Sequence, residues 1–346
     1  AAPEEEAVPT PRSAASLVCT DDGTLVLFAG EAGMEVSRAE RGMGDVWTLG
    51  APLGGWAECS CPAARWEAWQ CGTVALEDVP THRSNHAAVA CGDHLLVFGG
   101  WSADGGSPLA HPELLHLQTR CWTHCSTTNA APPPRGNPTL VYSKARHLAV
   151  LYGGWDGAAR LNDCWCLDME SWTWHRAATS AVEAPGARTD HASVLWRRSA
   201  REEYMLVFGG SIQSGATDKL WALDCSGGVP GMWSWQRLGG SESGGPWPPK
   251  RTSHAAAIAG SGDHASLVVV GGQDGSLGPG PAAIVADAWV LSSLGAPHRT
   301  WSRVDGWHGV YCCPISMPHL IGATTLDPAQ QFCSSLPENE LEEMRR

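Results

Sequence analysis

Five times along this chain, a short run of β-branched, apolar and aromatic residues ends in a glycine doublet or its near equivalent. The runs span residues 25–30, 95–100, 147–154, 205–210 and 267–272. Their last residues are separated by intervals of 70, 54, 56 and 62 residues. An internal repeat of this size constrains the fold more strongly than local propensity does. One such unit cannot bury both faces of its own sheet, so the copies are expected to pack against one another.

Each run has the same neighbours in sequence. An Arg-containing turn precedes it, at residues 11–16, 82–86, 134–137, 187–191 and 250–254. A segment centred on Trp or Leu follows it, and a last strand closes the unit at Trp56, Trp122, Trp174, Trp235 and Trp301. Short β-rich runs separated by Gly, Asp and Ser clusters predict antiparallel strands. Each unit therefore reads as four strands.

With these residues in view, the chain resembles the kelch family of β-propellers over roughly residues 10 to 304. The resemblance implies an all-β, kelch-type β-propeller of four-stranded antiparallel blades, with five clear repeats and an incomplete sixth. We expect one propeller domain over residues 10–335, between an acidic tail (1–9) and a charged tail (336–346). The expected blades cover residues 10–57, 79–124, 133–175, 185–237 and 249–303. Residues 314–335 are expected either to form a partial sixth blade or to pack onto another blade as a closure strand.

Charge and composition exclude several classes of partner. The net charge is −13, whereas a nucleic-acid binder needs a basic face, so we expect no nucleic-acid partner. No segment approaches 18 apolar residues, and residues 1–12 contain no apolar core of a signal peptide, so we expect neither a membrane span nor secretion. The 13 Cys are odd in number and irregularly spaced, which favours reduced thiols in a cytoplasmic or nuclear compartment.

The recurring residues have structural explanations. Gly lets strands near a propeller axis approach closely and turn, and paired Trp residues bury apolar area between neighbouring sheets. The Asp or Glu before each third strand is expected to satisfy turn amides. Cys164 and Cys166 are expected to pack as small apolar residues.

Several histidines and cysteines invite a metal hypothesis, which the sequence does not favour. His86, His191 and His254 recur in the Arg-containing turns, while blades one and three carry Ser16 and Pro138, so no complete ring exists. We expect each His to bond turn backbone in its own blade. The nearest approaches to a zinc cluster are Cys59, Cys61 and Cys71, and Cys121 with His124 and Cys125. Neither has the spacing of paired zinc knuckles, so we expect no metal and no cofactor.

Enzyme motifs are absent from the sequence: it contains no Gly-x-Ser-x-Gly elbow, phosphate loop or His-Glu-x-x-His. Some kelch-type propellers are copper oxidases or iron-dependent specifier proteins. Three of the four tyrosines lie at strand positions here, and the specifier pattern does not occur. We assign no catalytic residue. The alternative that stays open is a propeller enzyme, a metal-dependent lyase or oxidase, with its site at the channel mouth.

The loops that follow the glycine doublets are the predicted binding surface, because propeller loops at one face surround the channel mouth. Kelch adaptors similar to this chain often carry a ligand-contacting Arg at the position of Arg160. Exposed Trp and Arg together are typical interface anchors, although both could instead pack within their own loop. We therefore predict a protein-interaction module, a scaffold or adaptor that binds a protein or peptide. The predicted contact residues are Trp101, Trp155, Asp156, Arg160, Ser211, Gln273 and Asp274.

Overall fold

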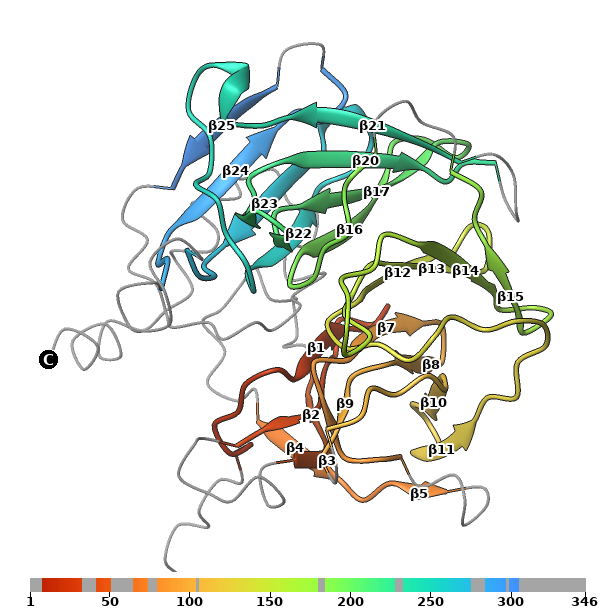
Figure 1. Cartoon of the computed structure of the whole chain (residues 1–346). Helices are drawn as coiled ribbons and strands as arrows, with labels where there is room; N and C mark the ends of the chain where they lie inside the picture. Colours follow the sequence, from red (N-terminus) through yellow and green to blue (C-terminus); the bar gives the residue numbers. More distant parts are fainter. Residues whose placement is uncertain are drawn as a thin grey trace, which may run out of the picture.

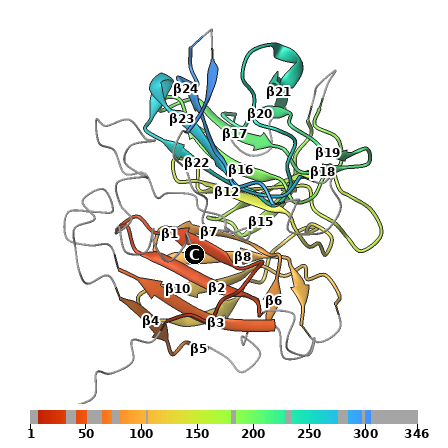
Figure 2. The same cartoon turned by 90° about the vertical axis from the view of Figure 1, so that its left-hand side faces the viewer.

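The strands form five antiparallel sheets of the four-stranded kind predicted from the repeats. The computed structural model describes residues 8–32, 42–50, 65–73, 80–103, 106–179, 184–227, 233–274, 284–296 and 299–304. The sheets follow one another in chain order as blades around a centre, from red to blue in Figure 1, and Figure 2 shows them from the side. The prediction of an all-β propeller with five clear blades is confirmed. The predicted sixth blade lies outside the described residues.

Each blade is a meander whose first strand lies nearest the centre (Figure 1). The inner strands pack in order, β1 against β7, β7 against β12, β12 against β16 and β16 against β22. Blade one consists of β1 Ser16–Cys19, β2 Leu25–Glu31, β3 Gly42–Leu49 and β4 Trp66–Trp69, and blade two of β7 Ala87–Cys91, β8 His94–Phe98, β10 Glu113–His116 and β11 Cys121–His124. Blade three consists of β12 Thr139–Ser143, β13 Leu148–Tyr152, β14 Cys164–Asp168 and β15 Thr173–Arg176, and blade four of β16 Ala192–Arg197, β17 Glu203–Phe208, β20 Leu220–Asp224 and β21 Ser234–Gly239. Blade five consists of β22 Ala255–Ala259, β23 Ser266–Val270, β24 Ala288–Ser292 and β25 Thr300–Arg303.

Short strands complete these sheets. The two residues of β5 (Gly72–Thr73) add to the outer edge of blade two, parallel to β11. Two small ladders form in the loops, β6 (Arg83–Ser84) with β9 (Trp101–Ser102) and β18 (Ser211–Ile212) with β19 (Gly215–Ala216). The first blade differs from the expectation that Trp56 closes it. Its fourth strand is β4, and Trp56 lies outside the described residues.

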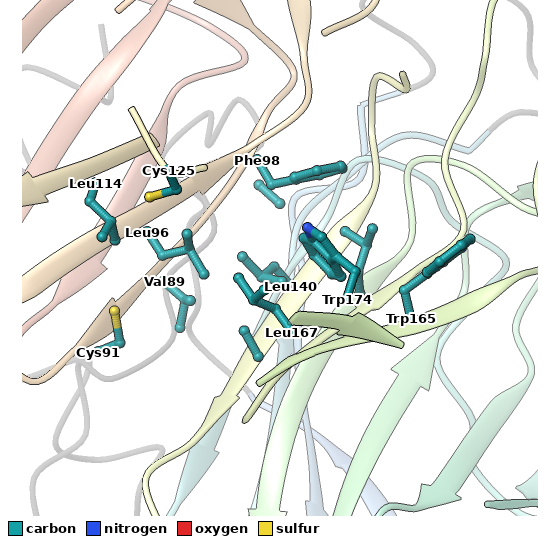
Figure 3. Packing of buried hydrophobic residues seen from close by; sticks show 13 residues of the cluster. Val89, Cys91, Leu96, Phe98, Leu114, Cys125, Leu140, Trp165, Leu167 and Trp174 are labelled. Carbon is teal, nitrogen blue, oxygen red and sulfur yellow. The ribbon is translucent and has the colours of Figure 1, made fainter. Parts of the chain in front are cut away.

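The hydrophobic core lies between blades. Four clusters each join two consecutive blades. Figure 3 shows the cluster between blades two and three, where Val89 and Leu96 face Leu140 and Trp174. The last aromatic residue of a second strand meets the closing Trp of the next blade, as in Phe28 with Trp122, at 4.9 Å between ring centroids. The same contact joins Phe98 to Trp174, Tyr152 to Trp235 and Phe208 to Trp301. The predicted role of the closing Trp residues is confirmed.

The glycine doublets allow close backbone approach, as predicted. A Cβ at Gly99 would lie 2.5 Å from the Arg135 carbonyl oxygen of the next blade. One at Gly100 would lie 2.7 Å from the Ser84 carbonyl oxygen in its own blade. Both glycines have positive φ, which residues with a Cβ rarely adopt. The doublet is therefore part of the scaffold.

In four of the five blades, the repeat Arg forms an ion pair with the acidic residue before the third strand, which corrects the expectation that this acid satisfies turn amides. Arg135 donates to both carboxylate oxygens of Asp163, at 2.6 and 2.9 Å. Corresponding pairs join Arg12 to Asp45, Arg83 to Glu113 and Arg251 to Asp287. A buried guanidinium needs such a partner because an unpaired buried charge is costly. In blade four the acid does bind a turn amide, since Ser241 N donates to Asp218 at 3.1 Å.

Each of the five arginines also fixes a glycine doublet. Its Nη1 donates to the carbonyl of the first doublet residue, as in Arg135 to Gly153 at 3.0 Å. The same bond joins Arg12 to Ala29, Arg83 to Gly99, Arg188 to Gly209 and Arg251 to Gly271. These bonds tie the turn before a blade's first strand to the end of its second strand. The loops that follow both elements therefore share one face.

Candidate functional site: the loop face

The residues that follow the glycine doublets occupy equivalent places on one face of the propeller. Each pairs with the Arg-containing turn of its own blade: Trp101 with Ser84, Trp155 with Gly136, Ser211 with Thr189 and Gln273 with Thr252. Because these pairings repeat blade by blade, four of the seven predicted residues lie at the same level around the channel mouth. The prediction that these loops share a face agrees with this arrangement.

Five residues with left-handed backbone line the channel at this face, and we call them the ring; backbone hydrogen bonds join several of them. The ring residues each stand two positions after a repeat Arg and have φ between 52° and 56°; they are Ala14, Asn85, Asn137, Asp190 and Ser253. Asn85 N donates to Ala14 O at 2.9 Å, Asn137 N to Asn85 O at 2.7 Å, and Ser253 N to Asp190 O at 2.8 Å. Asn and Asp tolerate this left-handed backbone better than most residues.

Side chains of the ring continue the polar network. Asn137 Nδ2 donates to Asn85 Oδ1 at 3.0 Å and to Asp190 Oδ1 at 2.6 Å. Burial raises the pKa of the Asp190 carboxyl, although the bond from Asn137 and the charge of Arg160 act in the opposite direction. Sequence reasoning missed Asn137 and Asp190 as members of the site. Their fixed place two residues after the repeat Arg was the available signal.

Arg160 is the cation of the face, and three contacts define its position. Its backbone pairs with Trp155, and its guanidinium carbon lies 5.6 Å from the Trp155 ring centroid. Its Nη2 donates to Ser211 Oγ of the next blade at 2.9 Å. Its Nε is buried and has no hydrogen-bond partner among the described residues. The side chain is thus held in place while part of its donor capacity is unused.

Trp101 extends this group towards blade two. Its Nε1 donates to Asn137 Oδ1 at 3.3 Å, and its indole lies against Gly136, where a Cβ would overlap the ring. Gly136 in turn bonds Trp155 in both directions, at 2.9 and 2.8 Å. Trp101, Trp155, Arg160 and Ser211 therefore form a continuous row across blades two, three and four, which we call the loop row.

The other three predicted residues have different surroundings. Asp156 accepts from Ala158 N and Ala159 N, both at 2.8 Å, and these bonds hold its pKa below the ordinary value. Its carboxylate therefore shapes the turn between Trp155 and Arg160. Gln273 is exposed and pairs with Thr252 and Ile284 within blade five, and the half-buried Asp274 follows it. The structure brings the loop row together and places these two residues in another blade.

Two of the three recurrent histidines bond between blades, which corrects the expectation of bonds within their own turns. His86 Nε2 lies 2.8 Å from Ser16 Oγ, and His191 Nε2 lies 2.8 Å from Thr139 Oγ1, in each case in the preceding blade. Ser16 is therefore the partner of a repeat histidine. His254 has no hydrogen-bond partner for either ring nitrogen among the described residues.

Metal-binding side chains are scattered in the part of the chain that the structure describes. No group of three or more His, Cys, Asp or Glu side chains there is arranged to hold an ion. Cys59 and Cys61 of one zinc candidate lie outside the described residues. Cys164 and Cys166 are buried in the cluster between blades three and four, which confirms their apolar role, and burial raises the pKa of Cys166 to about 12.

Behind the ring lies a channel cavity of about 340 Å³, lined by residues of β7, β12, β16 and β22 and by Ala14 and Ala15 ahead of β1. Alanine is the most frequent lining residue, and Asp21, Lys144 and Arg197 lie at the opposite end from the ring. Lys144 Nζ lies 2.5 Å from Asp21 Oδ2 and joins the turns of blades three and one, with both side chains exposed.

Within the described ranges, no helix is long and apolar enough to cross a membrane.

Comparison with known proteins agrees with this architecture. The family model described as KLHDC2/KLHL20/DRC7 Kelch-repeats domain matches residues 2–198. Dynein regulatory complex subunit 7 of Chlamydomonas reinhardtii is 29% identical over 165 residues, which are 47% of this chain and 14% of that protein. F-box/kelch-repeat protein At1g51550 of Arabidopsis thaliana is 26% identical over 64% of this chain and 44% of its own length. Host cell factor 1 of Rattus norvegicus is 32% identical over 43% of this chain and 8% of its own length. The matches thus span less than half of each of these relatives.

Proposed function

The chain belongs to the kelch-repeat family, and from this premise we propose that it is a protein-interaction module, a scaffold or adaptor, that binds its partner through the loop row. One relative is named as a subunit of a regulatory complex, which agrees with work through protein partners. The partner is a peptide or a protein domain that reaches into the shallow surface around the ring.

The position of Arg160 is the observation that carries this proposal. The guanidinium rests near the Trp155 ring and is fixed by Ser211, so little side-chain freedom is left to lose on binding. Trp and Arg dominate the energetics of protein interfaces when they are held in this way. The buried Nε of Arg160 would gain a partner from an acceptor on the bound chain.

Electrostatics favour this surface over the rest of the molecule for a partner that presents acceptor groups. The net charge of −13 repels acidic segments in general. The loop row offers a fixed cation and two indole rings at one place. A partner segment with a carbonyl or carboxylate for Arg160 and an apolar group for Trp155 fits this combination.

A capture experiment with matched variants tests the proposal. Tagged wild-type protein and the Trp155→Ala/Arg160→Ala variant are incubated with cell extract, and bound proteins are quantified by mass spectrometry. We expect the wild-type set of partners to be lost from the double variant. A Lys144→Ala/Arg197→Ala variant, altered at the opposite end of the channel, serves as the control and should keep them.

The proposal fails if the double variant retains its partners while its thermal unfolding matches the wild type. Metal analysis of the purified protein distinguishes the enzyme alternative. A stoichiometric iron, copper or zinc ion would argue against a module that acts by binding alone.

A further inference from the structure

In three blades, one or two residues of the chain pair with the outer edge of the fourth strand. Gly72–Thr73 lies parallel to Cys121–Trp122 in blade two, Thr128 lies parallel to Thr173 in blade three, and Thr179 lies parallel to Trp233 in blade four. In each case the covering residues belong to the connection from the preceding blade. An edge strand with unpaired backbone groups is a template for another strand, and these segments occupy it.

The hydrogen bonds of blade three define how the cover fits. Thr128 N donates to the Trp172 carbonyl at 3.0 Å, and Trp174 N donates to the Thr128 carbonyl at 3.4 Å. The hydroxyls of Thr128 and Thr173 lie 2.7 Å apart. The bond from Gly72 N to the Arg120 carbonyl, at 2.9 Å, repeats the first of these contacts in blade two. One residue of the covering segment thus satisfies one donor and one acceptor of the edge.

Blade five lacks this cover among the described residues. The connection that leads into it carries Pro246, Pro248 and Pro249, which have no N–H to donate to a neighbouring strand. Between them, Trp247 turns inward, where its ring lies 5.7 Å from that of Trp301 and its Nε1 donates to the Asp218 carbonyl at 2.8 Å. No described segment pairs with the outer edge of β25.

The register identifies the backbone groups available at this edge. Thr300 pairs with Ser292 and Trp301 with Leu291, as Thr173 pairs with Asp168 and Trp174 with Leu167. The Arg299 carbonyl and the Trp301 N–H therefore correspond to the groups that Thr128 satisfies in blade three. Thr300, Ser302 and Arg303 are exposed, so the edge is accessible.

We propose that the outer edge of β25 is a second docking site, which takes an extended peptide segment of a partner protein as a parallel fifth strand of blade five. The occupant follows from the covered blades. It is a proline-free segment with Thr or Ser opposite Thr300. An acidic residue three positions later stands opposite the exposed Arg303 and adds charge complementarity.

A synthetic peptide derived from the chain itself is the probe. It has the sequence of residues 126–131, Ser-Thr-Thr-Asn-Ala-Ala, with Glu replacing the last Ala so that it faces Arg303. Amide hydrogen exchange of the full chain is followed with and without the peptide. We expect at least tenfold slower exchange of the Trp301 amide at saturating peptide. A peptide N-methylated at the residue matching Thr128 lacks the donor for the Arg299 carbonyl and should give no protection.

Two variants of the protein separate the backbone and charge contributions. Arg303→Pro removes an outward N–H while the inward ladder is retained, because Val304 N and not Arg303 N bonds back to β24. We expect it to weaken peptide binding at least tenfold. Arg303→Ala keeps the backbone N–H and removes only the charge, so it should weaken peptide binding only a few-fold. This variant still tests binding at the β25 edge if Arg303→Pro folds poorly.

Three results would overturn the proposal. The first is a Trp301 amide already protected without peptide, which would mean that the edge is occupied within the chain. The second is no protection by millimolar peptide. The third is concentration-dependent dimerisation that Arg303→Pro abolishes, which would identify a second copy of the chain as the occupant. Partner capture through the loop row is measured independently, so failure of one site does not decide the other.

Discussion

His86 reaches out of its own blade and places its Nε2 2.8 Å from the Ser16 hydroxyl of the preceding blade. His191 makes the same contact with Thr139. The histidine stands three residues after a repeat Arg, and the hydroxyl stands four residues after the previous one. In blade four that second place is taken by Ala192, and His254 correspondingly has no partner among the described residues. The described part of the propeller thus contains two completed inter-blade bonds and one incomplete bond of the same kind.

Completing that bond should stabilise the protein. Ala192→Ser supplies a hydroxyl where Ser16 and Thr139 provide one in other blades. The new hydrogen bond is expected to raise the free energy of unfolding by about 1 kcal/mol. Urea unfolding of the purified variant measures this. Ala87→Ser is the control, since Pro138 stands at the histidine position of the following blade and offers no ring nitrogen. Equal effects of the two substitutions would contradict the prediction.

The buried histidines should make stability fall with acid. Burial, with the neighbouring Arg83 and Arg251, lowers the pKa of His86 and of His254 to about 3, and burial lowers that of His191 well below its ordinary value. An unfolded His binds a proton near pH 6.5. The unfolded chain therefore holds more protons between about pH 3 and 6.5, and stability is lost as the pH falls through this window.

The slope of unfolding free energy against pH can be assigned to single histidine side chains. Near pH 5 each buried His contributes about 1.4 kcal/mol per pH unit. His254→Gln should lower the slope of unfolding free energy against pH by that amount, and urea titrations between pH 4.5 and 6 measure it. The exposed His264 provides the comparison, since His264→Gln is expected to leave the slope near that of the wild type. An unchanged slope in His254→Gln would show that this ring titrates normally.

Two glycines with nearly the same φ separate backbone strain from steric overlap. Gly154 has φ of 106° and Gly215 has φ of 108°. A Cβ at Gly154 would lie 2.8 Å from the Gly136 carbonyl oxygen, whereas nothing lies within 4 Å at Gly215. Replacement by Ala costs about 1–3 kcal/mol of backbone strain at either site. We expect Gly154→Ala to cost about 1–3 kcal/mol more than Gly215→Ala in chemical denaturation, because backbone atoms must move. Similar losses would mean that the positive φ alone explains the need for glycine at position 154.

The repeat ion pairs should differ in importance according to their burial. Arg251 is fully buried and the Asp287 side chain is 8% exposed, whereas the Asp45 side chain facing Arg12 is 42% exposed. Asp287→Ala leaves a buried guanidinium without its carboxylate and is expected to cost about 3–5 kcal/mol. Asp45→Ala should cost less, because the Asp45 carboxylate stands at the solvent boundary and water can take its place beside Arg12, which is itself 3% exposed. Thermal unfolding of both variants provides the measurement, and equal losses would argue against burial as the cause.

Much of the candidate site could be placed from sequence because it follows from the repeat. Trp101, Trp155 and Ser211 come directly after a glycine doublet, so equal positions in the repeat predict equal positions on one face. Asp156 shows where this reasoning ends. Its carboxylate is turned back to the amides of Ala158 and Ala159. Asn137 and Asp190 were not foreseen because a polar residue in a turn does not reveal which other turn it faces.

By itself, the sequence determined the number of clear blades, the strands within them and the face on which the loops gather. These properties are local, because the alternation of side chains along a strand and the backbone freedom of glycine act over a few residues. Only the tertiary structure decided which side chains meet between blades, as His86 does with Ser16 and Arg160 with Ser211. It also decided which strand edge is left open, at Thr300. Such contacts join residues 50 or more apart in the chain, and they depend on how one twisted sheet is staggered against the next. The stagger results from packing of the whole ring, so no single repeat encodes it.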